Sequence, residues 1–294
     1  KVKQKYPGFN DRRWNDPKDP IWSKILERPE YDDSNWGIVS IPHTWSTYET
    51  TGELHPYIKN ASNRDNSYWW DGVGWYRKRF TVEKSLEGKK VFVEFEGVQK
   101  NCRVYINGKP MAEHFGGYTG FSVDLTDYIN FGGENVLAVS VSNKQDDDYK
   151  VAPMSGGCWN VYGGIYRNVK LVVTDKLYVP YAGSAKFEGG TFFTTPIVEK
   201  SKALLDMKTW VKNEYTENKE CRLTTTIFDK TGKVVAKVIS AKMIVPFYIE
   251  MFQQEVEVPD PLLWNTDTPN MYHAVSEIAI EDKTVDIYQT DFGI

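Results

Sequence analysis

The residues best suited to bind a ligand lie in two long polar segments, 46–71 and 144–157, and in the run that directly follows the second. Loops of this length inside a compact domain are usually functional or disordered. Both segments contain aromatic residues, whose ring faces pack well on the C–H surface of a pyranose. Acidic side chains accompany them. We expect these side chains to line one edge of a carbohydrate-binding surface: Trp69, Trp70, Asp146, Asp147, Asp148, Trp159 and Tyr162.

The tryptophans divide into two expected groups. The chain has 10 Trp and 18 Tyr residues, and part of this aromatic content must form hydrophobic core. We expect Trp36, Trp75 and Trp264 in the core. Trp69 and Trp70 are adjacent, and neighbouring residues on a strand point to opposite faces, so both cannot face one core. At least one of this pair is therefore expected at the binding surface, with burial of both as the alternative.

Other kinds of chemistry leave no trace in the sequence. It contains no HExxH, Walker A, GxSxG or CxxC pattern. The four histidines lack metal-ligand spacing, and the three cysteines lie far apart, so we expect structural histidines and buried thiols. We expect no metal and no cofactor. The net charge of −4 and the pI near 5.7 argue against nucleic acid and anionic membranes as partners.

The segments that must position these loops are β-strands. Residues 91–95 alternate apolar and other side chains, which is typical of a strand with one buried face. Residues 104–106 lead into Asn107-Gly108, a strong hairpin signal. Leu137, Val139 and Val141 form another apolar face. Short strands with tight turns and no long helical period indicate an antiparallel sandwich.

The second half of the chain predicts another all-β unit. Inward-type and outward-type side chains alternate along residues 203–211, and residues 223–227 show the same period of two. About seven strands fit this half, as in an immunoglobulin-like sandwich. The alternating strand pattern is interrupted at Val179-Pro180, so we expect one domain at residues 1–180 and another at residues 181–294. From these residues alone, the chain is a two-domain β protein with two polar, aromatic loops that binds carbohydrate.

Several motifs resemble one known family. The runs GVGWYRKRF, FEGV, VYINGK, GGYTGFSVDLTDYI, NVLAVSVSN and GGIYRNVKL resemble the N-terminal sugar-binding domain of family 2 glycoside hydrolases, the β-galactosidase and β-glucuronidase group. The lead-in DDSNWGIVSIPHTW is similar too. The pattern VxVPxPxLW and the final DFG resemble the family's immunoglobulin-like second domain. The resemblance implies a jelly-roll-like, galactose-binding-like sandwich followed by an immunoglobulin-like one, in an all-β chain.

The resemblance also implies what this chain lacks. In the family a TIM barrel follows the DFG segment and supplies the two glutamates of a retaining mechanism, whereas this chain stops at Ile294. Asn213-Glu214 imitates the family's catalytic Asn-Glu pair, but the strand pattern around it indicates a coincidence. Some members lend an Asn and an Asp from the first domain to the sugar pocket. Here that role could fall to Asn60, Asn63 or Asn66, and to Asp146, Asp147 or Asp148.

Three functions remain open. The chain is a non-catalytic portion of a retaining glycoside hydrolase that shapes the substrate pocket with the missing barrel, a stand-alone carbohydrate-binding module, or an assembly element that makes subunit contacts. Galactoside, glucuronide and mannoside are the candidate substrates. A full-length parent is expected to be an enzyme, with homo-oligomerisation as an option. We expect a periplasmic or secreted bacterial location, with a cytoplasmic one as the alternative.

Overall fold

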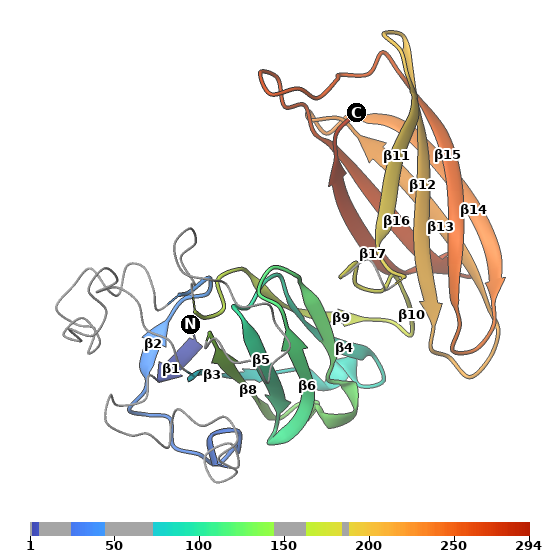
Figure 1. Ribbon diagram of the computed structural model, residues 1–294. Helices are drawn as coiled ribbons and strands as arrows, with labels where there is room; N and C mark the ends of the chain where they lie inside the picture. The colour runs from blue at the N-terminus through green and yellow to red at the C-terminus, as the bar shows by residue number, and fades with distance from the viewer. Residues whose placement is uncertain (1, 6–24, 45–72, 144–162, 184–187) are drawn as a thin grey trace. The chain divides into compact units, whose positions relative to one another are not determined.

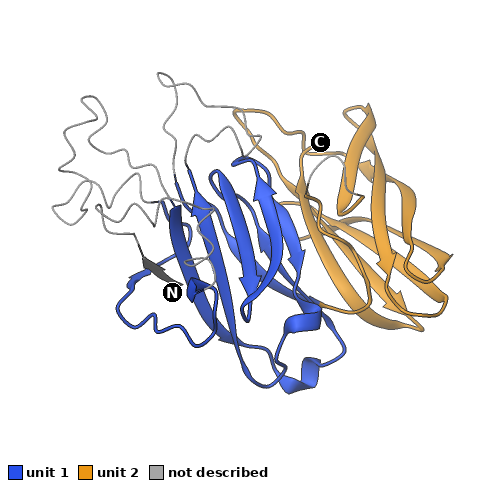
Figure 2. Cartoon of the chain, turned by 60° about the horizontal axis from the view of Figure 1, so that its bottom comes forward, with its two compact units in different colours: residues 1–173 blue, residues 174–294 orange. Residues whose placement is uncertain are grey.

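The computed structural model describes the backbone of residues 2–5, and it describes residues 25–44, 73–143, 163–183 and 188–294 in full. The chain divides into two compact units, unit 1 (residues 1–173) and unit 2 (residues 174–294) (Figure 2). The expected domain limits of 1–180 and 181–294 stay a prediction. No helix in the described parts is long and apolar enough to cross a membrane.

Unit 1 consists of two antiparallel sheets (Figure 1). The larger sheet has the strand order β2-β1-β3-β8-β5-β6, and the smaller has the order β7-β4-β9. Two 3-10 turns, Lys84–Leu86 and Thr126–Tyr128, lie between strands. The strands are β1 (Val2–Lys5), β2 (Gly37–Val39), β3 (Val73–Thr81), β4 (Lys90–Phe95), β5 (Asn101–Ile106), β6 (Lys109–Phe115), β7 (Phe121–Asp124), β8 (Glu134–Ser142) and β9 (Val169–Thr174).

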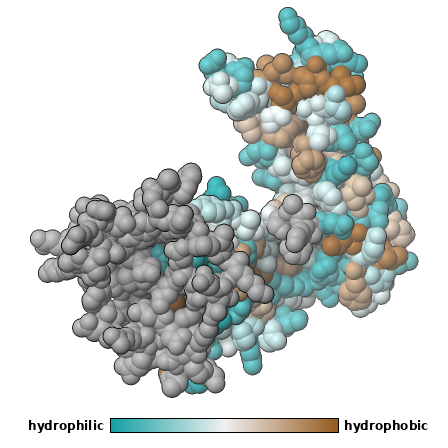
Figure 3. Space-filling view, viewed as in Figure 1, coloured by the Kyte–Doolittle hydropathy of each residue, from teal (hydrophilic) through white to brown (hydrophobic). Residues whose placement is uncertain are grey.

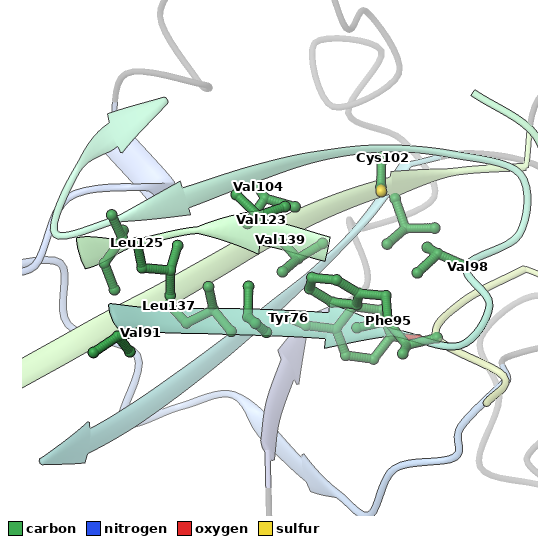
Figure 4. Close-up of a cluster of buried hydrophobic side chains, with 14 of the residues drawn as sticks. Tyr76, Val91, Phe95, Val98, Cys102, Val104, Val123, Leu125, Leu137 and Val139 are labelled. Atoms are coloured by element: carbon green, nitrogen blue, oxygen red, sulfur yellow. The ribbon is translucent and has the colours of Figure 1, made fainter. Parts of the chain in front are cut away.

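The core of unit 1 follows the alternation seen in the sequence. In β4 the side chains of Val91, Val93 and Phe95 are buried and their neighbours are less so, which confirms one inward face. Figure 4 shows Val91 and Phe95 gathered with side chains from β3, β5, β7 and β8. The β5–β6 hairpin turns at Asn107-Gly108, where both residues have positive φ values of 50° and 78°, as a type I′ turn requires.

A second, smaller core lies on the other face of the large sheet. It joins Trp75 of β3 and Tyr105 of β5 to Leu26 and Trp36 of the segment before β2. The Trp75 and Tyr105 rings stack at 5.8 Å between centroids. The expected burial of Trp36 and Trp75 is therefore confirmed, and the large sheet carries apolar packing on both faces.

Unit 2 is a sandwich of two antiparallel sheets. One sheet has the order β10-β12-β11, with β15 also paired to β12, and the other has the order β14-β13-β16-β17. Burial alternates strictly along β12, as its sequence predicts. The strands are β10 (Leu177–Tyr178), β11 (Thr191–Val198), β12 (Lys202–Asn213), β13 (Lys219–Phe228), β14 (Val234–Ile244), β15 (Ile249–Pro259), β16 (Tyr272–Ile280) and β17 (Lys283–Phe292).

The expected burial of Trp264 is wrong. Its side chain is 49% exposed, because it follows the end of β15 and lies in a loop rather than on an inward strand face. Its backbone N–H donates to the carbonyl of Ile294 at 2.7 Å. Leu262, Leu263 and Met271 on the same connection are also exposed. Figure 3 shows a hydrophobic area at the end of unit 2 that bears the C-terminus in Figure 1.

Buried thiols give a first prediction. Cys102 and Cys221 are free and buried, and burial raises the pKa of both, that of Cys221 to about 12. Since the thiolate is the reactive form, neither should react in the native protein. In a Cys158→Ser variant, Ellman's reagent is expected to label no thiol in buffer and both thiols in strong denaturant. Rapid labelling of Cys102 or Cys221 in buffer would contradict the buried placement.

The pKa values of two aspartates in unit 2 are shifted in opposite directions. Burial raises the pKa of Asp286, which accepts hydrogen bonds from Val179 N at 2.8 Å and Thr174 Oγ1 at 2.9 Å. The Thr231 hydroxyl holds the pKa of Asp229 below its usual range. The ordinary pKa of an aspartate is about 3.9. As pH rises from that value through the raised pKa of Asp286, ionisation of this buried carboxyl lowers the free energy of unfolding. Asp229 stabilises the fold above the ordinary value, and this contribution is lost as pH falls through its lowered pKa.

Carboxyl carbon NMR measures both midpoints directly. The Asp286 midpoint is expected above that of a peptide aspartate and the Asp229 midpoint below it. Coincident midpoints, or the reverse order, would show that the burial of Asp286 or the Thr231 contact is misplaced.

Candidate functional site

The two segments singled out in the sequence attach to the same end of unit 1. Residues 45–72 lead directly into Val73, the first residue of β3, and residues 144–162 follow Asn143, just after β8. Val73 pairs with Ser142 in the register of β3 and β8, and Ser142 pairs with Asn101 on β5. We call this end of the sheet, where β3 and β5 begin and β8 ends, the loop end.

Backbone hydrogen bonds connect the remaining attachment points. His43 N donates to Ile165 O at 2.8 Å, which joins the residues before one segment to those after the other. Gly164 and Gln99 exchange two backbone hydrogen bonds, of 2.9 and 3.1 Å. The fold therefore holds the ends of both segments together. The predicted site residues themselves lie outside the described residues: Asn60, Asn63, Asn66, Trp69, Trp70, Asp146, Asp147, Asp148, Trp159 and Tyr162.

Glycine allows close packing at the loop end. The Nδ1 atom of His43 lies 2.8 Å from the Tyr76 hydroxyl, and both residues are buried. Gly164 has φ = 122°, and a Cβ atom there would lie 2.5 Å from the Tyr76 hydroxyl oxygen. Any larger residue would clash and strain the backbone. The expectation that this histidine is structural fits its hydrogen bond to Tyr76.

Polar side chains are buried at the loop end. Between 2% and 6% of the surface of each is exposed, although charged and amide residues are mostly exposed in proteins. This cluster was not predicted, because a polar run directly before a strand looks like an ordinary turn. One signal in the sequence could have revealed the cluster: the apolar strand pattern begins at Cys102, directly after these polar residues. The cluster consists of His43, Gln99, Lys100, Asn101, Ser142 and Asn143.

Asn101 differs from the other members of this cluster. Both heteroatoms of its side-chain amide are buried, and neither has a hydrogen-bond partner among the described residues. Buried amides are almost always hydrogen-bonded, because an unmade bond costs about 1–3 kcal/mol.

The β6–β7 turn is fixed beside this cluster. Gly116 N donates to Lys100 O at 3.0 Å, and the Tyr166 hydroxyl donates to Gly117 O at 2.6 Å. A Cβ atom on Gly117 would lie 1.4 Å from Gln99 Oε1, so a larger residue would have to displace that buried side chain. Phe115, the last residue of β6, is 47% exposed, and Tyr118 within the turn is 69% exposed. The turn thus presents two aromatic side chains to solvent on a fixed backbone.

The Asn213-Glu214 pair makes its contacts within unit 2. Asn213 lies at the end of β12, fully buried, and its amide donates to the carbonyls of Glu217, Ile244 and Val245. Glu214 forms an ion pair with Lys212 and accepts a hydrogen bond from the Tyr178 hydroxyl at 2.9 Å. Within the described parts, no group of three or more His, Cys, Asp or Glu side chains could hold a metal ion.

Comparison with known families identifies the class of protein that this fold defines. Residues 29–175 match the model for glycosyl hydrolases family 2, sugar binding domain, and residues 188–294 match a second model, for glycosyl hydrolases family 2. The chain belongs to glycosyl hydrolase family 2, and the two matched regions follow each other as the resemblance implies.

Individual relatives agree with this assignment. A β-glucuronidase from Formosa agariphila is 35% identical over 290 residues, which cover 93% of this chain and 28% of the relative. A β-galactosidase from Bacteroides ovatus is 33% identical over 267 residues, covering 91% and 29%. The crystal structure of a family 2 member from Bacteroides cellulosilyticus matches with a TM-score of 0.80 and 28% identity, over 100% of this chain and 35% of the other. The chain thus spans about a third or less of the length of these relatives.

Proposed function

We propose that this chain is the non-catalytic, carbohydrate-binding portion of a family 2 glycosidase of the β-galactosidase and β-glucuronidase type. The observation that carries the proposal is the pair of family matches, in order, to a chain that spans about a third or less of its glycosidase relatives. In this role the loop end of unit 1 contributes walls to a substrate pocket. A catalytic domain outside this sequence supplies the rest of that pocket and the reacting carboxylates.

The architecture of the loop end supports this role. Segments 45–72 and 144–162 attach there, and both carry the aromatic and acidic side chains that suit a sugar. Their attachment points are joined by backbone hydrogen bonds through Gln99, Gly164 and His43. A rigid base of this kind reduces the conformational entropy that binding would otherwise cost. We infer that Asp146, Asp147 or Asp148, together with Trp69 or Trp70, contacts the substrate.

A chimaera tests the pocket-shaping role. Residues 1–294 would replace the matched segment of the β-glucuronidase from Formosa agariphila, and hydrolysis of an aryl β-glucuronide would be compared with that of the same enzyme lacking the segment. We expect activity only in the chimaera. Loss of a substrate contact should lower kcat/KM by about tenfold for Trp70→Ala, or for the joint change of Asp146 to Asp148 to asparagine.

The control is Tyr128→Leu. Tyr128 is also an exposed aromatic residue of unit 1, but it lies beside the Asn107 turn, at the other end of β5 from Asn101. This variant should retain the activity of the chimaera. Equal activity with and without residues 1–294 would argue against pocket shaping. A free chain that binds saccharide as tightly as the chimaera would favour a stand-alone binding module instead.

A further inference from the structure

We propose that two copies of this chain form a dimer in which their β14 strands pair antiparallel, about a two-fold axis at Ala241. The pairing joins the β14-β13-β16-β17 sheets of the two copies into one continuous sheet. The inference goes beyond the proposed function, because the contact lies in unit 2 and involves no carbohydrate. Its occupant is a second copy of this chain, so both copies offer the same surface to each other.

β14 is an edge strand. Among the described residues it pairs with β13 alone, and Figure 1 shows it at the right-hand edge of unit 2. Its register with β13 is regular from Ala236 to Ile244. One side of an edge strand carries backbone N–H and C=O groups that can pair with a strand of another chain. β14 therefore offers an open edge that is long enough for a ladder.

The outward face of β14 is apolar. Alternation places Ile239, Ala241 and Met243 on the same face of the strand, and we call these three residues the outward row. All three are exposed, Ile239 at 57% and Met243 at 58%. Val245, which follows the strand, is exposed as well. Single exposed apolar side chains are common, but a continuous row of them is typical of an interaction surface.

The other long edge strands of unit 2 carry features that hinder pairing with a second chain. β11 contains Pro196 and an irregular register beside it. β15 presents Glu255 and Glu257 to solvent. On β17, Asp286 accepts a hydrogen bond from Val179 N at 2.8 Å, which holds the segment after β10 beside this strand. The outward row of β14 contains neither a proline nor a charge.

An axis at Ala241 brings apolar side chains of the two copies together. Each Ile239 lies opposite Met243 of the other copy, and the small Ala241 lies on the axis, where the copies approach most closely. Moving the axis toward the end of the strand would shorten the ladder, and moving it to Ile239 would bring Lys237 opposite Ala241. The ladder about Ala241 spans residues 238–244 and supplies about seven hydrogen bonds between the copies.

The charged side chains near the outward row favour the same axis. Lys242 points to the other face, where its Nζ atom pairs with Glu250 Oε1 of β15 at 2.6 Å. Lys237 is exposed on the outward face, and an axis at Ala241 keeps the two copies of Lys237 about 27 Å apart, at a rise of about 3.4 Å per residue. Glu220 of β13 is exposed in register with the outward row. Lys237 of the second copy therefore approaches a carboxylate rather than another ammonium group.

The test is sedimentation velocity of the 294-residue chain at concentrations from about 1 to 300 µM, a range that brackets micromolar affinities. One strand pair with its outward row is a small interface, so we expect a Kd on the order of 10 µM. Because a two-fold contact uses the same surface on both copies, it closes, and the dimer should be the largest species.

Lysine variants locate the contact. Ile239→Lys and Met243→Lys are each expected to weaken dimerisation by at least about tenfold, because each variant puts two unpaired charges into the contact. The control is Ile287→Lys on β17, the opposite edge of the same sheet. Ile287 is 55% exposed, much like Ile239, and this variant should dimerise as wild type does.

A cysteine variant tests the axis without lysine substitutions. In the Cys158→Ser background, Ala241→Cys places two thiols opposite each other at a Cα separation of about 4.5–5.5 Å, which suits a disulfide. Mild oxidation is expected to link the two copies of this variant. The control Gln289→Cys, at an exposed position on β17, should remain unlinked.

Three results would each overturn the inference. The first is a chain that stays monomeric over the whole concentration range. The second is a dimer that Ile239→Lys and Met243→Lys leave as stable as that of wild type, since the contact would then lie elsewhere. The third is a dimer in which Ala241→Cys links no better than Gln289→Cys. None of these results bears on carbohydrate binding, so the proposed function stands or fails by its own assay.

Discussion

Replacing Arg77 by methionine is expected to destabilise unit 1 by about 3 kcal/mol, since it leaves a buried carboxylate without its main partner. The Arg77 side chain is fully buried, and its Nε donates to Asp33 Oδ2 at 3.0 Å. The same guanidinium donates to the backbone carbonyls of Leu26 and Arg28. This one side chain therefore attaches the segment before β2 to β3. Arg79, at 3.9 Å from Asp33, offsets only part of the loss.

Hydrogen exchange measured by mass spectrometry in increasing urea reports the unfolding of unit 1 separately from unit 2. The matched control is Arg103→Met on the same sheet, whose ion pair with Glu113 is exposed and worth at most about 1 kcal/mol. If Arg77→Met proves no more destabilising than Arg103→Met, the buried pair does not anchor the segment. The double variant Asp33→Leu/Arg77→Met should recover part of the loss, because no unpaired charge remains.

The second large effect is expected for Asn213→Ala in unit 2, at about 3 kcal/mol. The Asn213 amide donates to Ile244 O at 2.9 Å and Glu217 O at 3.0 Å, and its oxygen accepts from Tyr215 N at 2.9 Å. Alanine would leave these buried backbone groups unsatisfied, and each such loss costs about 1 kcal/mol or more. Because the Asn213 amide bonds to backbone groups of unit 2, we expect Asn213→Ala to act on stability and not on a catalytic step.

Asn218→Ala serves as the control for Asn213. Asn218 is an exposed asparagine on the same turn, and its replacement should change stability by less than about 0.5 kcal/mol. Urea unfolding of unit 2, monitored by hydrogen exchange of β12 and β13, measures both variants. Similar stability for the two would mean that Asn213 does not fasten the end of β12.

The strands and one hairpin were predictable because local sequence determines them. Alternation fixes which side of β4 and β12 is buried, and Asn107-Gly108 specifies a turn that needs two positive φ values. Trp264 was not predictable in this way. Its burial depends on where β15 ends, which tertiary packing decides, so a large aromatic residue close to a strand led to the wrong expectation.

The candidate site was only partly predictable for a similar reason. The aromatic and acidic composition of segments 46–71 and 144–157 singled them out, but their attachment to one end of a sheet results from the pairing of β3, β5 and β8. Asn101 and Phe115 carry no motif. They become neighbours only through the register of β5 and β6, a contact that periodicity within one strand does not reveal.

We propose that this polypeptide binds carbohydrate but does not hydrolyse it. A retaining glycosidase needs two carboxyl groups about 5–5.5 Å apart, one protonated and one ionised. Glu214, the residue that most resembles a catalytic glutamate in sequence, is instead engaged by Lys212 and Tyr178 at the end of a sandwich strand.

The most direct measurement is an assay of the purified chain with aryl β-galactoside, β-glucuronide and β-mannoside. The predicted result is no turnover above the buffer blank for any of the three, for the wild type and for Glu214→Gln alike. Turnover that survives Glu214→Gln would reveal an active site elsewhere in the chain, and turnover abolished by that change would show that Glu214 is catalytic. Either result would contradict the assignment of this chain as a non-catalytic portion.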